Sequence, residues 1–99
     1  MAEAGASMRL DRFLWFARLA KTRTLAQALA CDGRLRIDGR AVDRSAAPVR
    51  IGNILTFAVH DRVRVLRIET LPVRRGPAPE AQACYQELTA NVSQPSAID

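Results

Sequence analysis

The chain has 99 residues and carries 15 basic against 10 acidic side chains, a formal net charge of +5. This length is enough for one small domain and excludes a multidomain enzyme. No apolar run reaches the ~18–20 residues of a membrane span, and the first residues lack the features of a secretion signal. Two cysteines cannot build a disulfide framework or a four-ligand zinc site. We therefore expect a cytoplasmic domain with no membrane partner.

The positive charge is concentrated in the middle of the chain. All 15 bases lie within residues 9–75, whereas residues 76–99 carry three acids and no base. We expect a disordered segment over residues 1–8, a domain over residues 9–75 and an acidic extension over residues 76–99. A basic body suits a phosphate-bearing partner. From charge alone, a solvated basic surface with another role explains it equally well.

The first predicted element is a helix over residues 9–19, in which apolar side chains recur at helical spacing. Its buried face is expected to consist of Leu10, Phe13, Leu14 and Ala17. Trp15 and Phe16 widen this apolar surface. Core packing is the favoured interpretation of Trp15, and stacking on a nucleobase is the alternative.

A second helix is predicted to begin after Thr22, whose hydroxyl can accept a hydrogen bond from a backbone N–H of the first turn. Gly33 is expected to end this helix, because glycine readily adopts the left-handed conformation that follows a helix. The expected inner face consists of Leu25, Ala28 and Leu29, with Cys31 as a small buried residue.

Beyond Gly33 the apolar period changes from 3.6 residues to two, which predicts strands. Leu35 and Ile37 point to one face, and Asp38 with Gly39 predicts a tight turn into a short return strand over residues 40–42. Residues 43–48 are expected to form a loop.

A second hairpin is predicted from strands over residues 54–59 and 62–69, joined by a turn at His60 and Asp61. The apolar positions change parity between Val65 and Leu66, which indicates either a bulge or burial of both strand faces. A short helix is expected over about residues 80–88, with one side formed by Ala81, Cys84, Tyr85 and Leu88.

Together these elements predict an α+β fold, a two-helix hairpin packed on a small, mainly antiparallel β-sheet with a short C-terminal helix. The side chains expected in its core include Leu14, Leu29, Ile37 and Phe57.

Basic side chains cluster around the two predicted helices. Lys21 and Arg23 flank Thr22 at a helix start, where unpaired N–H groups and the helix dipole attract an anion. Further bases border the first helix and the outward side of the first hairpin, and Gln27 adds a neutral hydrogen-bonding group. The predicted RNA-binding residues are Arg9, Arg12, Lys21, Thr22, Arg23, Gln27, Arg34, Arg36 and Arg40.

Three stretches carry a family resemblance: RLDRFL at residues 9–14, KTRTLA at residues 21–26 and DGRLRIDG at residues 32–39. They resemble the S4-type RNA-binding domain (the alpha-L motif) over about residues 9–57. Leu35 and Ile37 stand where the family pattern has valines, and Asp38 where it has asparagine. The resemblance implies the same two-helix-plus-strand architecture and binding of structured RNA.

A narrower resemblance is to the family of the bacterial ribosome-associated heat-shock protein fifteen. It is carried by RLDRFLWFAR at residues 9–18, by KTR at residues 21–23, and by RRGPAPEA at residues 74–81 with the later Tyr85. It implies binding to ribosomal RNA of the large subunit during heat-stress rescue of ribosomes. The family continues in a long basic extension, which the acidic residues 76–99 do not resemble.

Other classes of function find less support in the sequence. His60, the only histidine, falls in a turn, neither cysteine has an activating base beside it, and no phosphate-binding loop or metal-ligand spacing occurs. We therefore expect no enzyme, cofactor, metal or small-molecule substrate, and a monomer. The alternatives are a protein–protein adapter that uses the C-terminal helix and a DNA-binding module that uses the same basic face.

Overall fold

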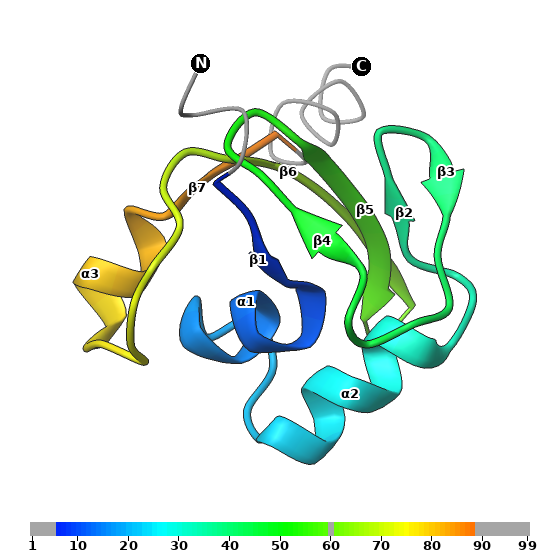
Figure 1. The fold of residues 1–99 in the computed structure, drawn as a ribbon, viewed down its shortest axis with the longest axis horizontal. Helices are drawn as coiled ribbons and strands as arrows, with labels where there is room; N and C mark the ends of the chain where they lie inside the picture. The colour runs from blue at the N-terminus through cyan, green and yellow to red at the C-terminus, as the bar shows by residue number, and fades with distance from the viewer. Residues whose placement is uncertain (1–5, 60, 89–99) are drawn as a thin grey trace, which may run out of the picture.

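Two helices pack beneath one face of a curved antiparallel sheet (Figure 1). The computed structural model describes residues 6–59 and 61–88. Its helices are α1 (Leu10–Phe16), α2 (Arg23–Cys31) and α3 (Ala78–Gln82). Its strands are β1 (Met8–Arg9), β2 (Arg36–Ile37), β3 (Arg40–Ala41), β4 (Pro48–Val49), β5 (Ile54–Val59), β6 (Arg62–Ile68) and β7 (Tyr85–Glu87).

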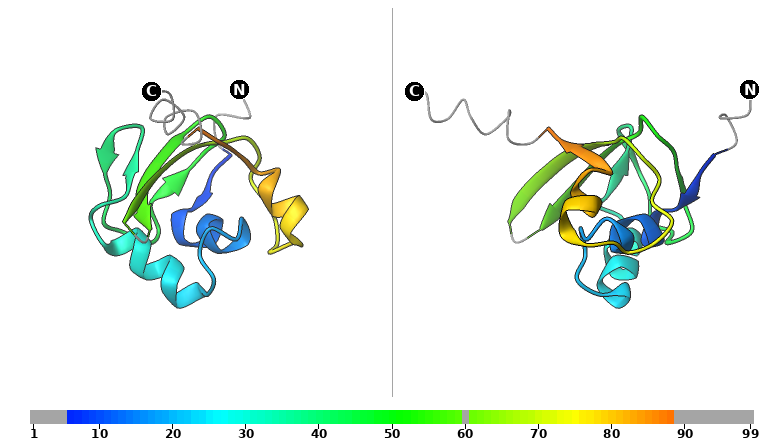
Figure 2. Two further views of the ribbon diagram at one scale, coloured as in Figure 1. Left: turned by 180° about the vertical axis from the view of Figure 1, so that it is seen from behind. Right: turned by 90° about the vertical axis from the view of Figure 1, so that its left-hand side faces the viewer.

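The main sheet has the strand order β3-β2-β5-β6-β7, and β1 pairs separately with β4. Every pairing is antiparallel. α3 lies on the far side of α1 from the β2–β3 hairpin (Figures 1 and 2). The core fills the space between the sheet and the first two helices. The predicted α+β architecture is confirmed.

α1 is shorter than its apolar pattern predicts. Its expected inner side chains are all buried, but the helix ends at Phe16. The chain then turns through Arg18, whose φ is +61°. Beyond it, the backbone N–H groups of Leu19 and Ala20 both donate to the carbonyl of Leu14, at 2.9 and 3.1 Å. This turn buries Leu19 and Ala20 and redirects the chain into α2.

The predicted ends of α2 are confirmed, but its predicted inner face is wrong. The Thr22 hydroxyl accepts a hydrogen bond from the N–H of Leu25 at 3.0 Å, and Gly33 follows the helix with a φ of +86°. The buried side chains are instead Ala26 and Ala30. Small residues four positions apart let two helices approach closely, so α2 packs on α1 along its alanines.

This rotation of α2 changes the environment of its larger side chains. Leu25 is 52% exposed, and Leu29 reaches the core only partly. Cys31 is exposed, because the residue after Ala30 lies about 100° around the helix from the buried face. The expectation of a buried Cys31 is therefore wrong.

The predicted hairpin turn at Asp38 and Gly39 is confirmed by two consecutive positive φ angles, +52° and +86°. Such a turn matches the twist of the strands that it joins. The Asp38 carboxylate accepts hydrogen bonds from the N–H of Ile54 at 2.9 Å and the amide of Asn53 at 2.8 Å. The turn is thus attached to the start of β5, next to a buried Leu35 and a half-buried Ile37.

β5 and β6 pair without interruption from Ile54 with Arg67 to Val59 with Arg62. The predicted bulge is therefore wrong. At the change of parity Leu66 is buried and its neighbour Val65, on the opposite face, is half-buried, so burial of both faces is partly confirmed there. Val63, further from β7 on the same face as Val65, is 56% exposed. His60 lies outside the described residues.

The helix expected over residues 80–88 is wrong in its second half. α3 is a short helix that ends at Gln82, and Tyr85 then pairs with Ile68 as the first residue of β7. An unpaired edge of β6 offers backbone donors and acceptors, which a third strand satisfies better than a continued helix would. Ala81 and Cys84 are buried as expected, so this segment packs back onto the sheet.

Candidate nucleic-acid interface

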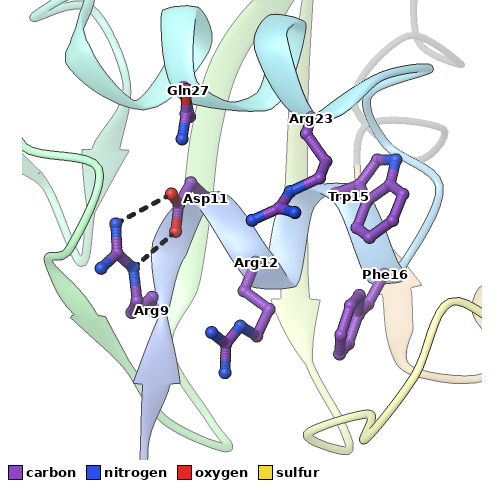
Figure 3. A pocket seen from close by; sticks show the side chains of 7 residues that line it. All are labelled: Arg9, Asp11, Arg12, Trp15, Phe16, Arg23 and Gln27. Atoms are coloured by element: carbon purple, nitrogen blue, oxygen red, sulfur yellow. Dashed lines mark hydrogen bonds and ion pairs between the residues drawn. The ribbon is translucent and has the colours of Figure 1, made fainter.

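Basic and aromatic side chains from α1 and α2 surround a cavity of about 330 Å³ (Figure 3). The lining residues are Arg9, Asp11, Arg12, Trp15, Phe16, Arg23 and Gln27. Positions four apart on a helix share a face. This spacing relates Asp11 to Trp15 on α1 and Arg23 to Gln27 on α2. The α1 residues supply polar and aromatic groups to the cavity, and the α2 residues supply polar groups.

Arg9 and Asp11 form a two-point ion pair at the edge of this cavity. Arg9 Nε donates to Asp11 Oδ1 at 3.0 Å, and Arg9 Nη2 donates to Oδ2 at 3.1 Å. Burial, with the residue only 8% exposed, would raise the pKa of Asp11, but the hydrogen bonds and charge of Arg9 more than offset it. The backbone of Arg12 and the Gln27 side chain lower this pKa further, so Asp11 is ionised and Arg9 is held by it.

Arg12 and Arg23 are the cations of the cavity that stay available to a ligand. Within residues 6–59 and 61–88, neither has a carboxylate within ion-pair distance. Both side chains line the same cavity, and Figure 3 shows Arg23 pointing from α2 toward α1. Guanidinium groups bind phosphate oxygens through paired hydrogen bonds, so two of them here form a candidate phosphate site.

Trp15 belongs both to the core and to the cavity wall. Its half-buried ring packs against the core cluster, as the favoured interpretation predicts, and lies 5.7 Å from the Phe16 ring. The guanidinium carbon of Arg23 lies 5.5 Å from the Trp15 ring centroid, and that of Arg75 lies 5.3 Å from it. A cation at such a distance is attracted by the electron-rich face of the indole.

Four of the predicted RNA-binding residues meet in this cavity, namely Arg9, Arg12, Arg23 and Gln27. Sequence reasoning missed Asp11 and Phe16 as part of the same site and considered Trp15 only as an alternative stacking residue. The signal was present in their spacing, because Asp11 and Trp15 lie four residues apart and Arg12 and Phe16 do the same. Only the packing of α2 on α1 shows that this side of α1 is not covered.

The other predicted residues lie elsewhere. Thr22 caps α2. Lys21 borders a separate, mainly apolar groove beside Leu25 and Leu29. Arg34 Nε lies 3.5 Å from an Asp32 carboxylate oxygen on the surface.

Two predicted arginines belong to the first hairpin. Arg36 donates to the carbonyl of Gly39 at 3.2 Å, across its own turn. Arg40 borders a shallow basic hollow that also includes Arg44 and Arg50. The cavity between α1 and α2 and this hollow are therefore two separate basic surfaces.

Metal and membrane features were sought in the same part of the chain. Across the described residues, no group of three or more His, Cys, Asp or Glu side chains could hold a metal ion. None of the helices there is long and apolar enough to cross a membrane.

Comparison with known proteins connects this arrangement to a family. The model of the S4 domain family matches residues 8–55. Heat shock protein 15 homolog of Haemophilus influenzae is 34% identical over 85 residues, which cover 86% of this chain and 64% of the relative. Heat shock protein 15 of Escherichia coli is 31% identical, with coverages of 86% and 63%. The chain thus spans somewhat less than two thirds of the length of these relatives.

Two further matches are informative. RQC P-site tRNA stabilizing factor of Bacillus subtilis is 36% identical over 64 residues, which cover 65% of this chain and 73% of that protein. The trimeric structure of Vibrio cholerae Heat Shock Protein 15 superimposes with a TM-score of 0.78 at 33% identity, covering 90% of this chain and 89% of that one. The chain therefore belongs to the heat shock protein 15 family of S4-domain proteins.

Proposed function

We propose that this protein binds structured RNA without catalysing a reaction, and that its ligand is ribosomal RNA of the large ribosomal subunit. The observation that carries this proposal is the pair of guanidinium groups of Arg12 and Arg23, which have no carboxylate partner among the described residues and line a cavity with Trp15. Phosphates supply most of the affinity in such an interface, and folded RNA presents them at fixed positions.

The residues of the cavity have distinct parts in this proposal. Arg12 and Arg23 bind phosphate oxygens, and Gln27 offers a neutral hydrogen bond. Asp11 holds Arg9 and reduces the local positive charge, which disfavours unselective binding of any polyanion. The predicted contacts outside the cavity would bind further parts of the same RNA; they are Lys21, Thr22, Arg34, Arg36 and Arg40.

The family supports a role in rescue of stalled ribosomes. The names of the relatives refer to heat shock and, for the Bacillus subtilis protein, to stabilisation of tRNA in the P site. We propose that this chain acts in the cytoplasm on large subunits released during heat stress. One chain supplies every residue of the cavity, so we propose that a monomer is the binding unit.

Co-sedimentation with separated large and small ribosomal subunits at several salt concentrations tests the proposal. We expect binding to the large subunit with a log–log salt slope of roughly −3 to −6, for about five to seven neutralised phosphates. The double variant Arg12→Glu/Arg23→Glu should lose this binding. The control Arg62→Glu/Arg74→Glu changes the same charge at two exposed residues outside the cavity and should retain most of it.

Other results would contradict the proposal. Equal losses of binding in both double variants would show that net charge alone drives association. Competition by duplex DNA as strong as that by folded RNA would favour the DNA-binding alternative. If the protein bound neither subunit at low salt, a protein partner would be favoured.

A further inference from the structure

Arg75 lies beyond β6 in the sequence, and its side chain contacts the end of α1. One of its Nη1 hydrogen bonds goes to the carbonyl of Trp15 and the other goes to the carbonyl of Ala20, at 3.3 Å. Its guanidinium also lies against the Trp15 ring. Arg75 is 20 residues beyond the matched S4 segment, which ends at residue 55, yet it touches the connection between the two helices that form the cavity.

The negative end of the α1 dipole favours a cation beside the last turn. The Trp15 carbonyl already accepts the backbone N–H of Arg18 at 3.1 Å, so Arg75 is a second donor to it. The last turn of α1 contains no basic residue, so Arg75 supplies the cation from a distant segment. Burial lowers the pKa of Arg75, and the nearby charge of Arg18 lowers it further.

A second hydrogen bond joins the α1–α2 connection to the same segment, with the donor now in the connection. Arg18, in its left-handed conformation, donates from Nε to the carbonyl of Gly76 at 2.7 Å. The segment at residues 75–76 and the turn at residues 15–20 therefore exchange hydrogen bonds through two arginines. A turn held from both sides fixes where α2 begins, and Arg23 is the first residue of α2.

Trp15 links Arg75 to the cavity. Its ring contacts the guanidinium of Arg75 and that of Arg23 at similar distances, 5.3 and 5.5 Å. With no carboxylate partner among the described residues, Arg23 depends on this ring for its orientation. Displacing Trp15 would let the long Arg23 side chain sample other rotamers, which lowers affinity for a phosphate at a fixed position.

We propose that Arg75 is a positioning residue of the RNA interface, which acts on Arg23 through Trp15 and the α1–α2 connection. The inference rests on the proposed function, because it concerns the same phosphate site. It adds a requirement that the S4 segment alone does not contain: Arg75 and Gly76 complete the interface without contacting RNA.

A double-mutant cycle on binding to salt-washed large ribosomal subunits tests this inference. Arg75→Gln should weaken binding about tenfold, as expected for loss of an oriented cation–π pair and its hydrogen bonds. In an Arg23→Gln background the same change should have less than about a twofold effect. The matched control is Arg74→Gln, which removes the same charge next door, where Arg74 contacts only Glu80 among the described residues; binding should change by less than about twofold.

Intrinsic fluorescence supplies a readout that a general loss of stability would not imitate. Trp15 is the only tryptophan in the chain. Its emission in the folded, RNA-free protein should change in Arg75→Gln and stay unchanged in Arg74→Gln. Should Arg75→Gln fail to fold, the cycle is run with Arg75→Lys, which keeps the charge but has no flat guanidinium to place against the ring. A loss that disappears in the Arg23→Gln background supports the inference, and wild-type affinity overturns it.

The outcomes separate the inference from the proposed function. Equal losses from Arg75→Gln in both backgrounds would mean that Arg75 acts independently of Arg23, and the inference would be wrong. If Arg23→Gln weakens binding while Arg75→Gln behaves as Arg74→Gln does, the inference alone fails. If Arg23→Gln itself has no effect, the proposed phosphate site fails and the inference falls with it.

Discussion

For two neighbouring residues of α2, the sequence pattern and the structure disagree about which side chain faces α1. The apolar pattern places Leu25 on the inner face, whereas the structure leaves Leu25 half exposed and buries Ala26 against α1. The substitutions Leu25→Ala and Ala26→Leu therefore test which face of α2 packs on α1.

The magnitudes follow from the burial of each side chain. Full burial of a leucine is worth about 1.5–3 kcal/mol, and Leu25 is 52% exposed, so Leu25→Ala should cost about 1 kcal/mol. Alanine's higher helix propensity offsets a small part of this cost. Ala26→Leu places three extra carbons between two closely packed helices, and overpacking of this kind costs about 1–3 kcal/mol.

Urea unfolding followed by Trp15 fluorescence and by circular dichroism measures both free energies. In a domain of this size, each kcal/mol corresponds to roughly 4–8 °C in Tm. Ala26→Leu should also separate α1 from α2 and so move Arg12 away from Arg23. Binding to large subunits should then weaken even at temperatures where the variant is folded, whereas Leu25→Ala should bind as the wild type does.

One result would refute this reasoning. If Leu25→Ala costs more than about 2 kcal/mol, as for a fully buried leucine, while Ala26→Leu is neutral, the helix faces α1 through its leucines. The alanine contact, and the cavity geometry that depends on it, would then be wrong.

Three further predictions concern the site and its frame. Asp11→Asn should lower stability at pH 7, and the difference from the wild type should shrink progressively in urea titrations as the pH falls below about 4. The folded-state pKa of Asp11 is lowered, so its stabilisation is present above the unfolded pKa of about 4 and is lost as the pH falls through the folded value; a pH-independent difference would contradict this. Thr22→Ala should cost about 1 kcal/mol through loss of the cap, with Thr22→Ser restoring most of it, and thermal unfolding of both variants decides the matter. Arg23→Glu should weaken co-sedimentation with large subunits far more than Lys21→Glu, because only Arg23 borders the cavity; equal losses would show that the α2 start, not the cavity, binds the RNA.

Features of the fold that depend on neighbours in the sequence could be predicted from it. Thr22 caps a helix because its hydroxyl lies within reach of an N–H three residues later. Gly39 follows Asp38 in a turn because both residues tolerate positive φ. The apolar, β-branched run over residues 54–59 between two turns predicts β5 with the bounds that the structure has.

Features that depend on residues distant in the sequence could not be predicted from it. Residues 85–87 have a helical pattern, but they form a strand because the edge of β6 is open beside them. In the candidate site, the charges of Arg12 and Arg23 are visible in the sequence, whereas their convergence requires α2 to pack through Ala26 and Ala30. The contact of Arg75 with Trp15 joins residues 60 positions apart. The sequence therefore predicts the local turns and helix caps, because their stabilising hydrogen bonds form between residues a few positions apart. Which faces of the helices and strands meet depends on the tertiary structure, because burial and backbone pairing are settled only when the whole chain packs.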